Sequence, residues 1–416
     1  MAFADKYILK KAITSYSVKK NPNNNLKIII VIPCYNEDKI IDTILSVKNN
    51  NYNDNLYEII IVINHSINDK IQIKNNNIKT LEQLNNNIKK NNWNNIFCIK
   101  AFDLPPKKSG VGFARKIGMD LAIKRFNDIN NNKGIIVSLD ADTLVKKNYL
   151  SEIDKIFSKN NIEGVSIYFE HQLNNKHINT KQDNAILLYE LHLRYFVLSL
   201  KFIGYQNVFH TVGSAFAITS LTYAKYGGMV TKKAGEDFYF INKIASNGKF
   251  KYLTKTTVYP SSRESDRVPF GTGPEVTKII KNDSLLTYDF NSFLDLKDFI
   301  NNFNWFYKIS EQDYKNICKN LPENLVDFLN QNNFFDNITK ISTNSTNIHT
   351  FKKAFFKWFS VFRVIKFLNL SHTVKYQKKD IISQVKIYLQ FTNNHNNITD
   401  NYKLLQLMRF IDYNNA

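Results

Sequence analysis

The feature that most constrains the fold is a regular alternation of short apolar segments with helical patterns in the N-terminal part of the chain. The helical patterns cover residues 38–48, 70–90 and 110–126. Segments that are apolar without interruption are typical of strands buried on both faces, as in a parallel sheet with helices on both sides. The sequence therefore predicts an α/β fold with a mostly parallel sheet and right-handed crossovers. The expected strands are residues 27–32, 58–63, 96–100 and 135–139.

Polar residues follow each expected strand. In an open parallel sheet, ligands bind beyond the carboxyl ends of the strands, so these residues are expected to converge at one edge. They are Pro33 to Glu37 (PCYNE) after the first strand, Asn64 to Ser66 after the second, Asp103 with Lys107 and Lys108 after the third, and Asp140 with Asp142 after the fourth.

Asp140 and Asp142 are the strongest candidates for metal ligands. They follow the fourth expected strand at alternate positions, separated by Ala141. Two carboxylates held this close repel each other, so the pair is most stable with a cation between them. Carboxylate ligands suit Mg²⁺ or Mn²⁺. An alternative interpretation needs no metal: Asp142 or Thr143 would cap a helix expected over residues 146–157.

A segment of lysine and small residues precedes the third expected helix. It comprises Lys107 to Gly112 (KKSGVG), and a helix N-terminus of this composition attracts phosphate. Lys108 and, one turn inside the helix, Arg115 are our candidates for contacting an anion. The alternative is a solvated lysine pair and an exposed arginine, which we favour for Lys107.

Length and composition indicate a globular protein with one large domain and a smaller one. The chain has 416 residues, of which 43% are hydrophobic. Its net charge of +20 usually suggests nucleic acid, anionic lipid or a polyanionic substrate. The charge is spread along the chain, however, and accompanies heavy use of Asn, Ile and Lys. No motif that reads DNA or RNA is recognisable, and we expect no nucleic-acid partner.

The sequence favours a cytoplasmic location. Its three cysteines have no metal-ligand spacing and indicate a reducing compartment. The first 25 residues contain no apolar core of a signal peptide. The most apolar later stretch, residues 185–205, is too polar to span a membrane because it contains Glu190, His192, Arg194 and Lys201.

Six motifs, in this order, resemble those of the family 2 glycosyltransferases, which have a GT-A fold. They span residues 27–260 and are PCYNE (33–37), the second strand with its NHS turn (64–66), KKSGVGFARKIGMDLA (107–122), LDAD (139–142), VGSAFAIT (212–219) and GEDFYF (235–240). The resemblance implies an enzyme that moves a sugar from a nucleotide diphosphate donor to an acceptor hydroxyl with a divalent metal, Mn²⁺ or Mg²⁺. Uridine is favoured as the nucleoside of the donor only because it is common among members of this family.

The resemblance also implies roles for individual residues. Asp142 is the direct metal ligand, assisted by Asp140. Asp237 is the general base that takes the acceptor's proton, and Glu236 binds or positions the acceptor. Direct attack would invert the anomeric configuration, although retention stays open. The donor-binding candidates are Pro33, Tyr35, Asn36, Glu37, Asn64, Lys108, Arg115, Asp140, Ala141, Asp142, Arg263 and Arg267.

Two departures from the family pattern affect these expectations. Family members usually carry an acid pair near the end of the second strand, where this chain has Ile63 and Asn64. Asn64 offers both a donor and an acceptor, so it can still contact a base edge. Many relatives also place a histidine on the metal after the ED pair, whereas this chain has no histidine between His210 and His349. We interpret His210 as structural.

Residues 259–273 are expected to form a loop that closes on the donor. Pro, Ser and Gly mark it as a loop. Its arginines, Arg263 and Arg267, have fork-shaped side chains that suit a diphosphate, and one of them would compensate leaving-group charge. The alternative is an ordinary surface loop with internal ion pairs.

The chain beyond residue 280 is expected to form a helical C-terminal domain. We divide the chain into an N-terminal extension (1–25), a GT-A domain (26–280) and the helical domain (281–416). Residues 337–347 are interpreted as a polar linker, and residues 351–368 as an amphipathic helix with five basic and no acidic residues. Such a helix usually faces a core, but it can also lie on an anionic membrane and bring the enzyme to lipid-linked acceptors. Its apolar stripe is Phe351, Phe355, Trp358, Phe362 and Ile365.

The sequence thus predicts a metal-dependent glycosyltransferase of GT-A fold that acts in glycan or glycolipid synthesis. A sugar-nucleotide-forming nucleotidyltransferase is the nearest alternative, but that class usually has a Gly-rich, Arg- or Lys-bearing loop where this chain has PCYNE. A non-catalytic basic binding module is the alternative from another class.

Overall fold

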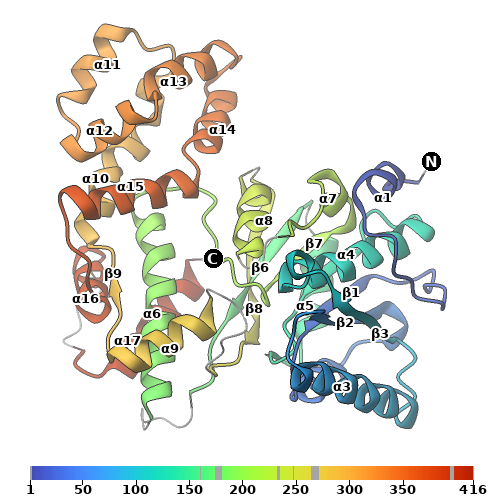
Figure 1. Ribbon diagram of the computed structural model, residues 1–416. Helices are drawn as coiled ribbons and strands as arrows, with labels where there is room; N and C mark the ends of the chain where they lie inside the picture. Colours follow the sequence, from blue (N-terminus) through green and yellow to red (C-terminus); the bar gives the residue numbers. More distant parts are fainter. Residues whose placement is uncertain are drawn as a thin grey trace.

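The computed structural model describes residues 2–159, 161–173, 180–231, 235–246, 248–263, 271–393 and 398–415. Within these residues an eight-stranded sheet has the order β3-β2-β1-β4-β7-β6-β8-β5 (Figure 1). The pairs β3–β2, β2–β1, β1–β4 and β6–β8 are parallel, and the pairs β4–β7, β7–β6 and β8–β5 are antiparallel. The strands are β1 (Ile28–Cys34), β2 (Tyr57–Ser66), β3 (Ile96–Leu104), β4 (Ile135–Ser138), β5 (Leu144–Val145), β6 (Gly164–Phe169), β7 (Phe216–Thr219) and β8 (Phe250–Tyr259).

Helices cover both faces of this sheet, as the alternating side chains of β1 demonstrate. Ile28, Ile30 and Ile32 belong to one buried apolar cluster, which also contains residues of α2, α3 and α5. Ile29 and Val31 belong to another, which contains residues of α1, α4 and α8. The predicted mostly parallel sheet with helices on both faces is therefore confirmed. The helices of this part are α1 (Asp5–Lys11), α2 (Ile40–Lys48), α3 (Ile71–Lys90), α4 (Val111–Asp128), α5 (Tyr149–Lys159), α7 (Ser220–Lys225) and α8 (Glu236–Ala245).

The segment after Asp142 contradicts the helix-cap interpretation of the two aspartates. The chain forms β5 (Leu144–Val145) before α5 begins at Tyr149. Asp142 and Thr143 are therefore not at a helix N-terminus. The physical reason is that Val145 pairs with Val258 of β8, which holds this segment extended.

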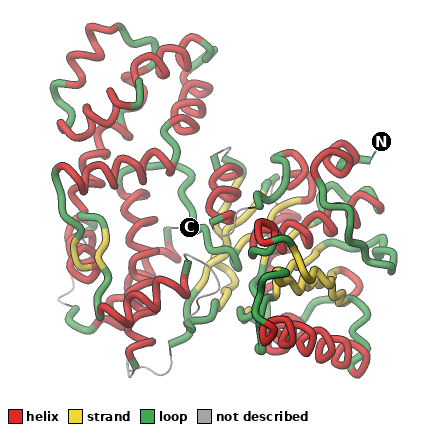
Figure 2. Tube along the Cα trace, viewed as in Figure 1, coloured by secondary structure: helices red, strands yellow, loops and turns green. Residues whose placement is uncertain are grey.

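The C-terminal half is helical, and α6 (Lys181–Phe202) belongs to it in space. Figure 2 shows strands concentrated in one part of the molecule and helices filling the other. Residues of α6 share one large apolar cluster with the C-terminal helices. The helical C-terminal extension is confirmed. Its elements are α9 (Thr272–Asn282), β9 (Leu286–Thr287), α10 (Phe290–Asn301), α11 (Glu311–Cys318), α12 (Glu323–Gln331), α13 (Phe334–Thr343), α14 (Ile348–Trp358), α15 (Val361–Val374), β10 (Lys379–Asp380), α16 (Ile381–Phe391) and α17 (Asn401–Asn414).

Two predictions for this half are wrong. Most of the expected linker 337–347 is helical and forms part of α13, whose Ile338 is fully buried. The expected single helix over 351–368 is two helices, α14 and α15, separated at Phe359. Phe359 is fully buried, and its ring lies 4.9 Å from that of Phe299. At this break between the two helices, the side chain of Phe359 packs in the same apolar core as Phe351 and Phe355.

No helix in the described part of the chain is long and apolar enough to cross a membrane. This result agrees with the interpretation of residues 185–205, because α6 buries Glu190 and Arg194 as partners of each other inside the protein.

Candidate functional site

A cavity of about 620 Å³ lies beyond the carboxyl ends of β1, β2 and β4 and extends towards α6 and α8. Its position is the one expected for ligand binding in an open α/β sheet. Two of the predicted site residues, Asn36 and Lys108, are not part of its lining, and Arg267 lies outside the described residues. The predicted site residues that line the cavity are Pro33, Tyr35, Glu37, Asn64, Arg115, Asp140, Ala141, Asp142, Glu236, Asp237 and Arg263.

Asn36 and Lys108 are placed differently from what we expected. Asn36 has a left-handed backbone with φ of 49°, and its N–H donates to Asn77 Oδ1 at 2.8 Å. It therefore shapes the turn that carries Tyr35 and Glu37. Lys108 is exposed in a short 3-10 turn, Pro106–Lys108, before α4.

Asn64, at the end of β2, is buried and lines the cavity. Its Nδ2 donates to the carbonyl oxygen of Ser109 at 2.7 Å. This bond ties the end of β2 to the loop before α4, so the donor group of Asn64 serves the fold.

Arg115 joins the two acidic motifs. Its Nη2 donates to Asp140 Oδ1 at 2.6 Å, and its Nη1 contacts Glu236 Oε1. Only 3% of the Arg115 side chain and 2% of the Glu236 side chain are exposed. An ion pair this deeply buried has little freedom to rearrange, because a charge left alone there would be costly. Arg115 therefore holds the loop after β4 and the start of α8 at one place.

Arg263 makes a second bridge across the cavity. Its Nη2 lies 2.9 Å from Asp142 Oδ2, and its Nη1 donates to Glu37 Oε1 at 3.1 Å. Glu37 belongs to the turn after β1, and Arg263 follows β8. Each aspartate of the LDAD motif is thus paired with a different arginine.

Asp237 lies in the first turn of α8, and its pKa is raised. Gly235, the residue before α8, has a left-handed backbone with φ of 72°, which a glycine adopts without strain. The backbone N–H of Phe238 donates to Asp237 Oδ1 at 2.7 Å. Burial and the negative charge of Glu236 raise the pKa of Asp237 to about 7, against the opposing effect of Arg115.

Gly213, within the VGSAFAIT motif, is a site residue that our sequence reasoning missed. A Cβ atom added at this position would lie 2.7 Å from Asp237 Oδ2 and 3.0 Å from Arg115 Nη2. Only glycine leaves room for both side chains as they stand. The signal in the sequence was an isolated glycine beside the strand-like apolar segment 215–218, where the close approach of other groups is a common reason for a glycine.

The described residues that line the cavity are predominantly acidic. Their carboxylates exceed their guanidinium groups by four: the acids are Glu37, Asp69, Asp140, Asp142, Glu236 and Asp237, and the bases are Arg115 and Arg263. Such an excess favours a bound cation. No group of three or more His, Cys, Asp or Glu side chains gathers around one point in the described residues. The carboxylates of the LDAD motif fit Mg²⁺ or Mn²⁺, which commonly take one or two protein carboxylates and complete their shell with water and phosphate oxygens.

A second buried network of charges lies beside the cavity. Glu190 of α6 accepts from Arg194 and Arg409, and Asp412 of α17 contacts Arg194 Nη1. His210 Nε2 lies 3.0 Å from Asp412 Oδ2, and His210 is 4% exposed. These contacts support the structural interpretation of His210. Sequence reasoning had no means of pairing α6 with α17, because these helices are about 200 residues apart in the chain.

No known family model matches the chain, and no curated protein does. Among solved structures, it is similar to S. aureus TarS 1–349 in complex with UDP-GlcNAc, with a TM-score of 0.42 and 13% identity over 77% of this chain and 92% of that chain. GalNAc-T7 with UDP, GalNAc and Mn²⁺ is similar with a TM-score of 0.38 and 17% identity over 66% of this chain and 50% of that chain. Because both TM-scores are below 0.5 and both identities are below 25%, these similarities carry no argument about the function of this chain.

Proposed function

We propose that this protein is a metal-dependent glycosyltransferase that moves a sugar from a nucleotide diphosphate donor, with UDP-sugars favoured, to an acceptor hydroxyl with inversion of configuration. The observation that carries the proposal is the position of Arg115 between Asp140 and Glu236. It brings a candidate metal-binding motif and a candidate general base to one cavity at the carboxyl edge of the sheet. A nucleotidyltransferase usually has a Gly-rich, Arg- or Lys-bearing loop where this chain has PCYNE (33–37), and a basic binding module does not account for an acidic cavity.

The donor end of the cavity requires a cation. A nucleotide diphosphate is an anion, and the described lining has four more carboxylates than guanidinium groups. Asp142, with Asp140 beside it, would hold a divalent metal, which would supply the missing positive charge next to the leaving diphosphate. Asp142 must exchange its contact with Arg263 for this role, whereas Arg263 keeps its contact with Glu37 beside the diphosphate site.

Asp237 acts at the acceptor end. Because its Oδ1 accepts from the N–H of Phe238, we assign the proton transfer to Oδ2. As Oδ2 takes the proton of the acceptor hydroxyl, the oxygen forms a bond to the anomeric carbon, and the bond from that carbon to the diphosphate oxygen breaks. The nucleoside diphosphate leaves from the opposite face. A base with a pKa near 7 is well matched to this task at neutral pH.

The two arginines have different proposed roles. Arg115 was a candidate for binding the donor. Its contacts with Asp140 and Glu236 favour a different role, in which Arg115 positions these two acids. Arg263 keeps its proposed role beside the diphosphate. The proposed closing loop remains a prediction, since residues 264–270, with Arg267, lie outside the described residues.

A thermal-shift experiment tests the proposal. UDP is expected to raise the melting temperature in Mn²⁺ but not in EDTA, and at a hundred times the dissociation constant the added stability is about 2.7 kcal/mol. Asp142→Asn is expected to abolish the shift, and Asp128→Asn, an exposed control at the end of α4, to leave it unchanged. An equal shift in EDTA contradicts the metal dependence. If no nucleoside diphosphate shifts the transition in Mn²⁺, the proposed function is wrong.

A further inference from the structure

The cavity continues past Asp237 along one face of α6. Five residues of this helix line it, at positions that recur every three to four residues. We call this surface the α6 wall: Tyr189, His192, Leu193, Phe196 and Val197. Four of its members are only partly buried, although apolar helix faces inside proteins are usually covered completely. The wall therefore presents apolar surface to the cavity.

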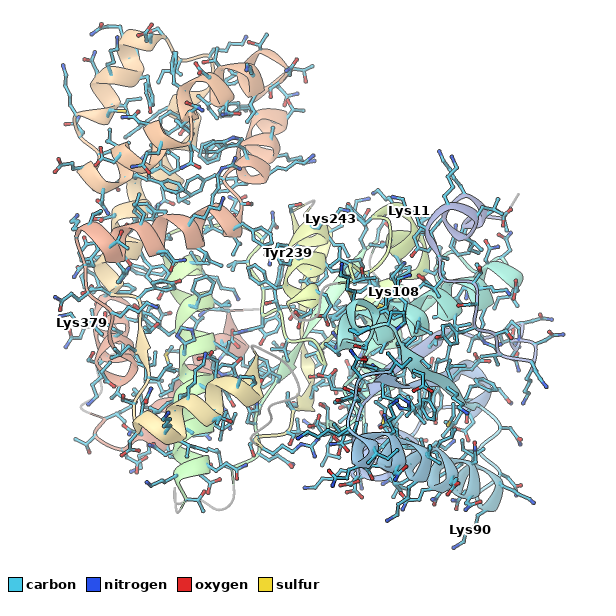
Figure 3. All side chains as sticks on the ribbon, in the orientation of Figure 1. Lys11, Lys90, Lys108, Tyr239, Lys243 and Lys379 are labelled. Carbon is cyan, nitrogen blue, oxygen red and sulfur yellow. The ribbon has the colours of Figure 1, made fainter. Side chains whose placement is uncertain are left out.

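Helices α8 and α15 also border the cavity, close to Asp237. Phe238 of α8 and Val361 of α15 line the cavity there. The ring of Phe362 lies 4.9 Å from Phe238 and stacks on Tyr239 at 4.6 Å, and Figure 3 shows Tyr239 on the side of α8 that faces α15. The C-terminal extension thus completes this end of the site, next to the proposed base.

The α6 wall is mostly apolar and contains no charged side chain. It contains no Lys, Arg, Asp or Glu, and its only ionisable groups are Tyr189 and His192. His192 Nδ1 lies 2.9 Å from Thr287 Oγ1, and burial lowers the pKa of His192 to about 4, so its ring is neutral at physiological pH. Leu193, Phe196 and Val197 offer no hydrogen bonds at all.

These features restrict the acceptor. A polyanionic acceptor would find no unpaired cation here, because both arginines in the described lining contact carboxylates. The hydroxyl groups of an unmodified glycan would find no hydrogen-bonding partner at Leu193, Phe196 or Val197 in place of water, which costs free energy. An apolar group would gain free energy there through burial.

We propose that the acceptor carries an apolar group, alkyl or aryl, next to its reacting hydroxyl, and that the α6 wall binds this group while the hydroxyl faces Asp237. This inference rests on the proposed function and names the class of its acceptor. It also assigns a purpose to the helical extension, which builds part of the acceptor site.

The experiment measures how affinity depends on the apolar group. Methyl, butyl, hexyl and octyl β-glucosides are titrated calorimetrically, below their micelle concentrations, into protein saturated with UDP and Mn²⁺. We expect the affinity to rise by up to about fourfold for each methylene that enters the cavity. Glucose and maltose are expected to bind more weakly than octyl glucoside. A flat series, or glucose and maltose binding as tightly as octyl glucoside, overturns the proposal.

A matched pair of variants on one helix locates the binding. Phe196→Ala removes a ring from the α6 wall and is expected to reduce the ratio of octyl to methyl affinity by about tenfold. Phe202→Ala removes a partly buried ring of the same helix that does not line the cavity, and is expected to leave the ratio unchanged. Equal effects of the two variants overturn the proposal, because they indicate a general loss of stability.

Two further measurements distinguish an aromatic from a lipid acceptor, and a failure of this inference from a failure of the proposed function. p-Nitrophenyl glucoside binding better than hexyl glucoside indicates an aromatic acceptor, whereas an affinity that still rises at octyl indicates a lipid, and either result supports the proposal. UDP binding is followed separately by thermal shift. A UDP shift with a flat alkyl series refutes only this inference, whereas chain-length dependence without any UDP shift refutes the proposed function and the acceptor role together.

Discussion

At the scale of single residues, the candidate site depends on a balance between acids and arginines. Burial and the negative charges of Glu236 and Asp140 raise the pKa of Asp237, and Arg115 opposes this effect. Arg115 is too deeply buried and too well paired to serve an incoming phosphate as well. With Arg115 held in these contacts, the net effect raises the pKa of Asp237 to about 7.

The first prediction concerns the chemistry of Asp237. Asp237→Asn is expected to lower kcat by between about a hundredfold and ten thousandfold, the usual contribution of a general base, while UDP and Mn²⁺ still bind. In the unmodified protein, activity should rise as the pH increases through about 7, because only the deprotonated carboxylate accepts a proton. Steady-state rates between pH 5.5 and 9 measure both effects. A pH profile that is level through this range excludes Asp237 as the base.

The second prediction concerns stability and uses the same variant without metal. An unfolded Asp loses its proton near pH 3.8, whereas folded Asp237 keeps it up to about pH 7. Between these values the folded state binds more protons, so Asp237 lowers the stability increasingly as the pH rises. Asp237→Asn should therefore be more stable than the unmodified protein at pH 8, with a difference that disappears near pH 4. Urea unfolding at several pH values in EDTA measures the difference, and one that does not vary with pH contradicts the prediction.

The third prediction tests the space that Gly213 provides. Gly213→Ala is expected to reduce kcat by about a hundredfold, because the new methyl group must displace Asp237 or Arg115. Gly118→Ala is the matched control: its methyl group would lie 2.3 Å from Val31 Cγ1 in the core, away from the cavity. The control should lower the melting temperature and leave the pH dependence of kcat unchanged. Normal activity of Gly213→Ala shows that the site tolerates the methyl group.

At the scale of elements, α6 connects the sheet to the C-terminal helices. Its apolar residues pack in the helical cluster, and one of its faces lines the cavity. Its charged residues meet α17 in a buried network. These polar contacts fix the rotation of α6, and therefore determine which of its residues form the α6 wall.

The fourth prediction tests the docking of α17. Burial raises the pKa of Asp412, but His210 and Arg194 outweigh this effect and lower it overall. Its stabilising effect is thus present at neutral pH and is lost as the pH falls below the ordinary range of an aspartate. Asp412→Ala should cost about 3–5 kcal/mol at pH 7, because it removes a charged partner from a buried network and takes away the acceptor that Arg194 Nη1 and His210 Nε2 share.

Asp400→Ala is the control on the same helix. Asp400 caps the N-terminus of α17 by accepting from the N–H of Lys403 at 2.7 Å, and its loss should cost about 1 kcal/mol. Chemical denaturation measures both variants. Similar costs for the two would contradict a stabilising role of the buried network.

At the scale of the whole molecule, the net charge of +20 and the acidic cavity are separate features. Figure 3 labels five lysines, Lys11, Lys90, Lys108, Lys243 and Lys379, which are exposed on different elements of both halves. The positive charge is therefore spread over the surface, as its distribution along the sequence indicated. The described lining of the cavity has the opposite sign.

The fifth prediction concerns the boundary that we placed at residue 280, which remains a prediction. A chain ending there keeps α6 and most of α9 but loses the other C-terminal helices that cover α6. Residues 1–280 alone are expected to aggregate or to unfold without cooperativity, because α6 would expose a large apolar face. Circular dichroism during heating, compared with the full chain, is the measurement. A sharp unfolding transition of the shorter chain would establish residues 26–280 as an independent domain.

The sequence by itself determined the elements of the sheet and the motifs at its edge. Unbroken apolar segments have few alternatives to buried parallel strands, and the residues after each strand end must share one edge, so their meeting in a cavity was predictable. Only the tertiary structure decided what depends on contacts between distant segments: that Arg115 pairs with Asp140 and Glu236, that Gly213 makes room for Asp237, and that α14 and α15 break at Phe359. A helical or strand periodicity records which face of a segment is apolar, but it does not record which other segment covers that face. The partners of buried charges, and hence the pKa of Asp237 and the composition of the α6 wall, follow from that packing.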